Sequence, residues 1–238
     1  MSVKNFLLIL FFAVSLLNAS EMRVVNTSGP DMVFRALLIE KSLRGDGLKC
    51  VVTQDTFDNA VKKLISAKAD IVLVKDDGRL LKNLPQTLER RKFAETRLAV
   101  FVNPANPVVK MSFADLKKVW NGDIERWSHF NGANIFSIHR FGMMLDSGEF
   151  EYIRRNWDLR AGAEHFPLGS AAQIIAMTAG NPNAIGIAVW EKSIALDRVK
   201  LVELLDEKGK SMLLKIPHYV IYRKADRIMV EKFLQKQD

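Results

Sequence analysis

The sequence has 238 residues, of which 48% are hydrophobic and 26% are charged. A chain of this length and composition can fill a core without disulfides or metal, which indicates an ordinary globular protein of one large domain or two small lobes. The 35 Lys and Arg residues outnumber the 27 Asp and Glu residues, giving a formal net charge of +8 that attracts anions. Because the basic residues occur in pairs on mixed segments rather than in long runs, we expect no nucleic-acid binding.

The first twenty residues have the pattern of a signal peptide. Lys4 precedes twelve apolar residues at positions 6–17, and small residues follow at Ala19 and Ser20. Twelve residues are too few to cross a bilayer, which needs about 20. We therefore expect residues 1–20 to be removed from an exported, soluble, periplasmic chain. The alternative is an uncleaved membrane anchor.

Strands and helices alternate through the first third of the chain. Short apolar strands are expected at 22–26 and 48–53, and an almost wholly apolar strand at 69–75. Apolar residues at helical spacing predict one helix over 33–41 and another over 57–65. This alternation indicates an open parallel sheet, whose ligands collect at the carboxyl ends of its strands.

Two polar segments follow these strands. Ser28 and Gly29 come after the first strand and before a helix, so their amides could meet an anion at the positive end of the helix dipole. The same residues can be a plain cap. Asp76 and Asp77 come after the third strand, where a simple turn is the alternative to a ligand contact.

A polar, charged connection is expected from residue 82 to a strand that begins at Leu98. The sequence Asn-Pro-Ala-Asn-Pro at 103–107 ends that strand, because proline removes a ladder donor. Ser112 then caps a short amphipathic helix, which Gly122 terminates in the left-handed conformation.

An apolar strand is expected to end at Arg140, whose planar guanidinium suits two oxygens of an oxyanion. A structural ion pair is the alternative role for this arginine. Ser147 and Gly148 begin the next helix and offer outward-pointing amides, and Ser170 begins another.

The last third of the chain completes the predicted elements. A strand is expected at 184–189, a hairpin from 200–205 and 212–222, and a C-terminal helix with Ile228 and Phe233 on its apolar face.

Catalysis and metal binding have little support in the sequence. The four histidines lack metal-ligand spacing, and a lone cysteine in an apolar strand is expected to be buried. No nucleophile elbow, phosphate-binding loop or dinucleotide fingerprint is present. We therefore expect no enzyme activity, no cofactor and no metal. The lone cysteine is Cys50, and the four histidines are His129, His139, His165 and His218.

Several of these motifs, in this order, resemble a known family. The motifs cover most of residues 99–190. They are NPANP, SFADLKKVWNGDIERW, a strand with Arg140, the pair Ser147 and Gly148, and NPNAIGIAVW. They are similar to the second lobe of the phosphate-type periplasmic solute-binding proteins. The resemblance implies an α/β fold of two lobes, the type II periplasmic-binding-protein-like fold, with mixed sheets, flanking helices and a two-strand hinge.

The resemblance also implies domain boundaries. One lobe would comprise residues 21–97 plus 191–238, and the other residues 98–190. The chain would cross between the lobes near Leu98 and near Trp190, and hinges of this kind let lobes close around a ligand.

The function implied is capture of a small oxyanion, phosphate first, by a monomer that delivers it to the membrane subunits of an ABC importer. Arg140, Ser147, Gly148, Ser28 and Gly29 would hold the ligand. Asp77 would stand where the family places an aspartate that accepts a proton from the bound oxyanion.

Two departures from the family pattern keep an alternative open. The family's arginine stands four residues before the serine, whereas Arg140 precedes Ser147 by seven, and Glu149 replaces a threonine. The alternative is a degenerate member that acts as an exported interaction or sensory module without phosphate binding.

Overall fold

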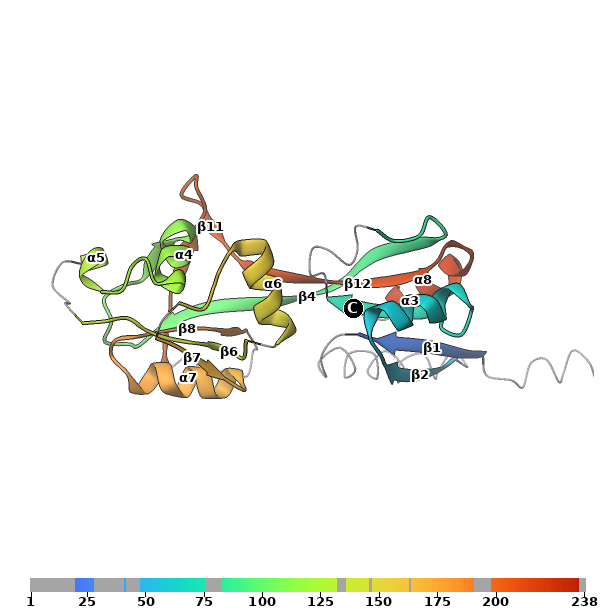
Figure 1. Ribbon diagram of the computed structural model, residues 1–238, viewed down its shortest axis with the longest axis horizontal. Coiled ribbons are helices and arrows are strands. Elements are labelled where there is room, and N and C mark those ends of the chain that lie inside the picture. Colours follow the sequence, from blue (N-terminus) through green and yellow to red (C-terminus); the bar gives the residue numbers. More distant parts are fainter. Residues whose placement is uncertain are drawn as a thin grey trace, which may run out of the picture. The chain divides into compact units, whose positions relative to one another are not determined.

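The computed structural model describes residues 20–27, 41, 48–75, 83–131, 136–145, 147–162, 164–190 and 198–235. Its contacts divide the chain into two compact units, shown as ribbons in Figure 1. Unit 1 comprises residues 1–75, 84–93 and 219–238, and unit 2 comprises residues 76–83 and 94–218.

The parallel sheet expected in the first third of the chain is present in unit 1. Strand β1 (Ser20–Asn26) pairs in parallel with β2 (Leu48–Gln54) and with β3 (Ile71–Lys75). Helix α3 (Phe57–Ile65) connects β2 to β3 and begins at Thr56, whose hydroxyl accepts a hydrogen bond from the third residue of the helix. The helix predicted over 33–41 lies, apart from its last residue, outside the described residues.

Two long strands contribute to both units. They are β4 (Leu88–Val102) and β12 (Leu214–Arg223), which run antiparallel to each other. The strand order in unit 1 is β2-β1-β3-β12-β4. Helix α8 (Arg227–Gln235) packs on β4, where Phe233 and Phe93 stack with ring centroids 5.8 Å apart.

The prediction of a charged connection before Leu98 is wrong, because β4 already begins at Leu88. Leu88 and Phe93 are buried while Arg90, Arg91 and Lys92 stay exposed, so a few inward side chains suffice to anchor a strand whose other face is solvated.

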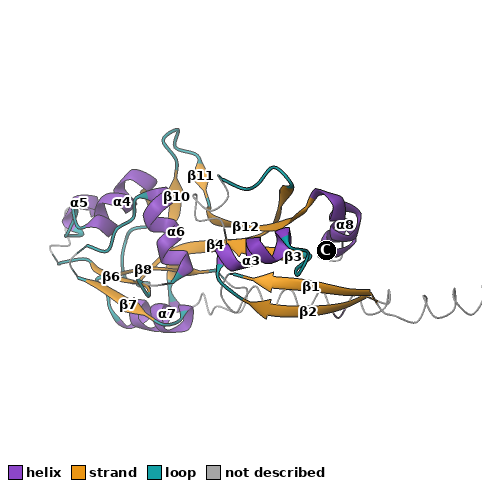
Figure 2. Ribbon diagram, turned by 45° about the vertical axis from the view of Figure 1, so that its right-hand side comes forward, coloured by secondary structure: helices purple, strands orange, loops and turns teal. Residues whose placement is uncertain are grey.

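Unit 2 is built on a second group of strands (Figure 2). Strand β8 (Ala184–Val189) runs antiparallel to β4, and β6 (His139–Met143) runs parallel to β8. Strand β7 (His165–Leu168) runs parallel to β6 at the edge. Because β6 and β8 are parallel, Met143 and Val189 lie at the same edge of the sheet, where open α/β sheets bind ligands.

Helices cover both faces of this sheet. Helix α7 (Ala171–Gly180) packs against β6, β7 and β8, and α4 (Phe113–Asn121) and α6 (Gly148–Trp157) lie on the opposite face (Figure 1). A short helix, α5 (Ser128–Asn131), follows α4.

Two glycines let these helices approach the sheet closely. A Cβ on Gly142 would lie 2.6 Å from His165 Cε1 and 2.7 Å from Trp120 Cζ2. On the other face, a Cβ on Gly186 would lie 2.6 Å from Thr178 Oγ1 in α7. Any larger residue at either position would push a helix or a ring away from the sheet.

The predicted helix boundaries in this unit are confirmed. Ser112, Ser147 and Ser170 each accept a hydrogen bond from the amide three residues later, as N-cap side chains do. Gly122 ends α4 with φ 92°, the left-handed conformation expected of it.

A small second sheet completes unit 2. Strand β10 (Glu203–Leu205) pairs in parallel with β5 (Lys110–Ser112) and antiparallel with β11 (Ser211–Met212). The predicted hairpin is therefore present only next to its turn, because residues 214–223 form β12 between β3 and β4 of the large sheet. Strand β9 (Lys200–Leu201) pairs with the end of β4.

Two details differ from the predictions. Arg140 is the second residue of β6 rather than its last. Ile228 is 77% exposed, because the buried face of α8 is formed by Val230 and Phe233 instead. Among the described strands, the two units divide within β4 and within β12. The predicted lobe boundaries stay a prediction.

Candidate functional site

The predicted ligand contacts fall into two groups. Ser28, Gly29 and Asp77 lie outside the described residues, so their role stays a prediction. Arg140, Ser147 and Gly148 belong to β6 and to the start of α6 in unit 2.

The start of α6 is the part of the predicted site with the right local geometry. The Ser147 hydroxyl accepts a hydrogen bond of 3.1 Å from the Phe150 amide. Among the described residues, a Cβ on Gly148 would have no neighbour within 4 Å, so these residues leave the backbone of the first turn open to approach from outside. The amides of such a turn lie at the positive end of the helix dipole and favour an anion.

Acidic residues in the first turn act against an anionic ligand. Glu149 and Glu151 both lie there. Glu151 bonds to Arg154 and Arg155, and the hydrogen bond from Arg154 lowers the pKa of the Glu151 carboxyl. Glu149 adds a carboxylate beside the amides that would hold the ligand, and that charge competes with an anion.

Arg140 is buried, with 1% of its surface exposed. Its Nε donates to the carbonyl oxygen of Val119 and its Nη2 donates to that of Ile124 at 3.3 Å. Burial lowers the pKa of the guanidinium, against the opposing charges of Glu164 and Glu125. The side chain therefore stabilises the carboxyl end of α4, where cations and donors satisfy carbonyl groups that the helix leaves open.

The two hydrogen bonds described for Arg140 are with backbone carbonyls, and they test neither of its expected roles, a ligand contact or a structural ion pair. The residue four positions before Ser147, where the resembling family has its arginine, is Met143, and only 7% of its surface is exposed. A contact between Arg140 and a ligand stays a prediction.

The sequence does not predict that His165 lies next to β6 and the start of α6. Its imidazole packs edge-on against Trp120, with centroids 5.3 Å apart, and against Phe150 at 5.8 Å. Burial lowers the pKa of His165, and a backbone contact with Met143 partly offsets this effect. The Nε1–H group of Trp120 has no hydrogen-bond partner among the described residues. The one signal in the sequence was Gly142, which leaves room for both rings.

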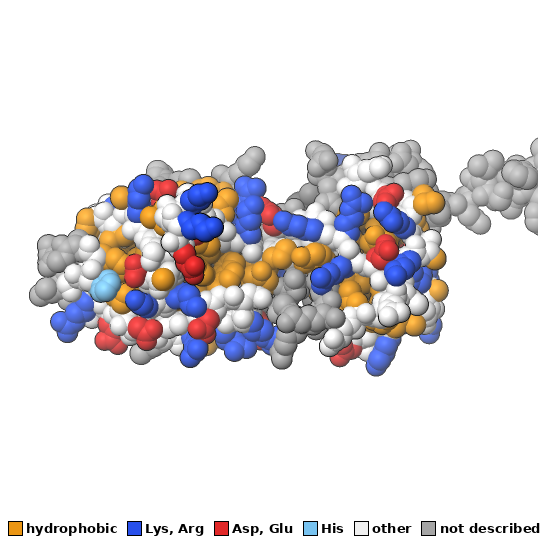
Figure 3. All heavy atoms as spheres, turned by 90° about the horizontal axis from the view of Figure 1, so that it is seen from above, with side chains coloured by type: hydrophobic (Ala, Val, Ile, Leu, Met, Phe, Trp, Pro, Cys, Tyr) orange, Lys and Arg blue, Asp and Glu red, His pale blue; other side chains and the backbone are white. Residues whose placement is uncertain are grey.

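The face of the molecule in Figure 3 carries charges of both signs. Figure 3 shows a face on which Lys and Arg side chains are mixed with Asp and Glu side chains. Within the described ranges, no group of three or more His, Cys, Asp or Glu side chains could hold a metal ion. The same part of the chain contains no helix that is both long and apolar enough to span a bilayer.

Comparison with known proteins rests on structure. No family model matches the sequence, and no curated protein matches it. An ABC-type phosphate transport receptor from Vibrio cholerae is similar with a TM-score of 0.69 and 19% identity, over 90% of this chain and 92% of that one. PstS from Borrelia burgdorferi is similar with a TM-score of 0.68 and 13% identity, over 91% and 92% of the two chains.

The chain has the two-lobe fold of the phosphate-type periplasmic binding proteins. This confirms the fold and the resemblance inferred from residues 99–190. The regulatory domain of the LysR-family regulator MetR from N. meningitidis is also similar, with a TM-score of 0.57, 13% identity and coverage of 92% of each chain. This fold is shared by transport receptors and by a regulatory domain.

Proposed function

We propose that this protein is an exported solute-binding protein that holds a small oxyanion, phosphate first, at the start of α6 and delivers it to an ABC importer. The observation that carries the proposal is the Ser147-capped first turn of a ten-residue helix with open space at Gly148, at the strand edge where this type of sheet binds ligands. The net positive charge would raise the local concentration of such an anion.

A second function is favoured by one specific observation. Arg140 bonds to the carbonyls of Val119 and Ile124, and Met143 occupies the position of the family's arginine. A receptor without that guanidinium and with Glu149 in its first turn would bind phosphate weakly or not at all. The protein would then be an exported interaction or sensory module on the same fold.

Thermal unfolding with a panel of anions separates the two functions. A ligand that binds only the folded state at a hundred times its Kd stabilises it by about 2.7 kcal/mol. Solute capture predicts such stabilisation by phosphate, arsenate or sulfate. The interaction module predicts an unchanged midpoint with every anion in the panel.

A further inference from the structure

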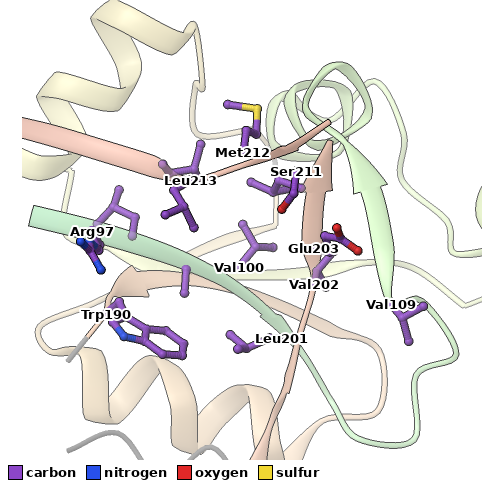
Figure 4. A pocket seen from close by; sticks show the side chains of 14 residues that line it. Arg97, Val100, Val109, Trp190, Leu201, Val202, Glu203, Ser211, Met212 and Leu213 are labelled. Atoms are coloured by element: carbon purple, nitrogen blue, oxygen red, sulfur yellow. The ribbon is translucent and has the colours of Figure 1, made fainter. Parts of the chain in front are cut away.

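Unit 2 contains an apolar cavity where β4 separates from the segment of β11 and β12. Its volume is about 420 Å³, within the range of about 300 to 1,000 Å³ typical of pockets for small molecules. Figure 4 shows side chains from β4, β9 and the 211–214 segment around it. The apolar residues that matter below are Val100, Trp190, Leu201 and Leu213.

Part of this lining is unusually exposed for aliphatic side chains. Leu213 is 60% exposed, Val109 is 52% exposed and Leu201 is 40% exposed, and all three line the cavity. Their apolar surface stays in contact with water unless an occupant covers it, and covering it is favourable in proportion to the area removed from water.

The charges differ between the two ends of the cavity. At the end with Arg97 and Trp190, the Glu95 carboxylate bonds to two cations, Arg97 at 3.2 Å and Lys215 at 2.8 Å. Of these three described side chains, two are positive and one is negative, so this end favours an anionic group.

The opposite end carries a balanced pair. Val109 lies there (Figure 4), next to Lys110, whose ammonium is 3.0 Å from the Glu203 carboxylate. One end of an apolar cavity thus attracts a negative charge, and the other end attracts no charge of either sign.

We propose that this cavity binds a medium-chain aliphatic carboxylate. Its carboxylate lies at Arg97, and its alkyl chain runs along Val100 and Leu201 toward Val109. An inorganic oxyanion has no apolar part to cover Leu201 and Leu213, and a neutral or cationic amphiphile gains nothing from Arg97. The proposal goes beyond oxyanion capture at α6 and does not depend on it.

Calorimetric titration of the exported protein with four probes tests the proposal. Decanoate is expected to bind, and hexanoate to bind at least tenfold more weakly, because each buried methylene contributes about fourfold to affinity. Decanol and decyltrimethylammonium are expected to bind at least about fivefold more weakly than decanoate, because neither forms the surface charge pair with Arg97. Absence of heat with decanoate, or equal binding of decanol, overturns the proposal.

Matched variants locate the site. The double variant Leu201→Ser/Leu213→Ser is expected to weaken decanoate binding at least tenfold, whereas Ile65→Ser, at a 55% exposed position outside the cavity, leaves it unchanged. Arg97→Gln is expected to weaken it about fivefold, whereas Arg154→Gln, which alters another exposed arginine bonded to a glutamate, has no effect.

The positions chosen for these variants are exposed, so the fold tolerates them, and the unfolding midpoint of each variant confirms this directly. Decanoate binding that is unaffected by both the double variant and Arg97→Gln would place the ligand elsewhere and overturn the proposal. A phosphate titration of the same variants reports on α6 separately, so failure of one proposal is distinguishable from failure of the other.

Discussion

Arg140 shows how one residue can take a structural role at a position that suggests a ligand. Its guanidinium is 1% exposed and donates to backbone carbonyls 21 and 16 residues away in sequence. A donor group of this kind both satisfies buried acceptors and fixes the end of a helix against the sheet.

Arg140→Met is therefore expected to lower the free energy of unfolding by about 2 kcal/mol, because the carbonyls of Val119 and Ile124 each lose the guanidinium donor while the side-chain volume is nearly kept. Urea unfolding measures the change, and Arg126→Met on the exposed side of the following loop is the control. A loss as small as that of the control would show that water replaces the guanidinium.

At the scale of elements, the predictable features are those set by neighbours in sequence. The ends of α4 and α6 follow from Ser112, Gly122 and Ser147, which act within one helical turn. The Arg140 carbonyl contacts and the ring packing of His165 could not be predicted in this way, because each joins elements that only the tertiary fold brings together.

The start of β4 illustrates the same limit. Its charged sequence predicts a connection, and only its pairing within the sheet makes it a strand.

Close packing of α4 on β6 makes Gly142 a sensitive position. Gly142→Ala is expected to cost about 2 kcal/mol, because its Cβ would overlap the rings of His165 and Trp120. Gly180→Ala, where a Cβ meets nothing within 4 Å, is expected to be neutral or slightly stabilising. Equal unfolding midpoints for the two variants would contradict the close approach of helix and strand.

For the whole molecule, the half-buried His165 gives the free energy of unfolding a pH dependence. Burial lowers its folded-state pKa below the ordinary value of 6.5, so the unfolded chain binds the proton more readily. The free energy of unfolding therefore falls as the pH drops below about 6.5, by at most about 1.4 kcal/mol per pH unit for this group, and levels off below the folded-state pKa.

His165→Phe keeps an aromatic ring against Trp120 and Phe150, and it is expected to remove the contribution of His165 to the change of the free energy of unfolding with pH. His129→Gln, at an exposed position, is expected to retain it. Urea unfolding between pH 5 and pH 7, a window that includes the ordinary histidine pKa of about 6.5, measures both slopes. The same slope in His165→Phe as in the wild type would show that another group causes the dependence.

The central claim is that the first turn of α6 holds a small oxyanion, and calorimetric titration with inorganic phosphate tests it most directly. The protein is purified, unfolded and refolded to remove bound ligand, and compared with Gly148→Val and with Gly180→Val, two positions at which an added Cβ meets no described atom within 4 Å. The account predicts saturable binding by the wild type and by Gly180→Val, and loss of binding in Gly148→Val because its side chain covers the amides. No heat with the wild type, or undiminished binding by Gly148→Val, would contradict it.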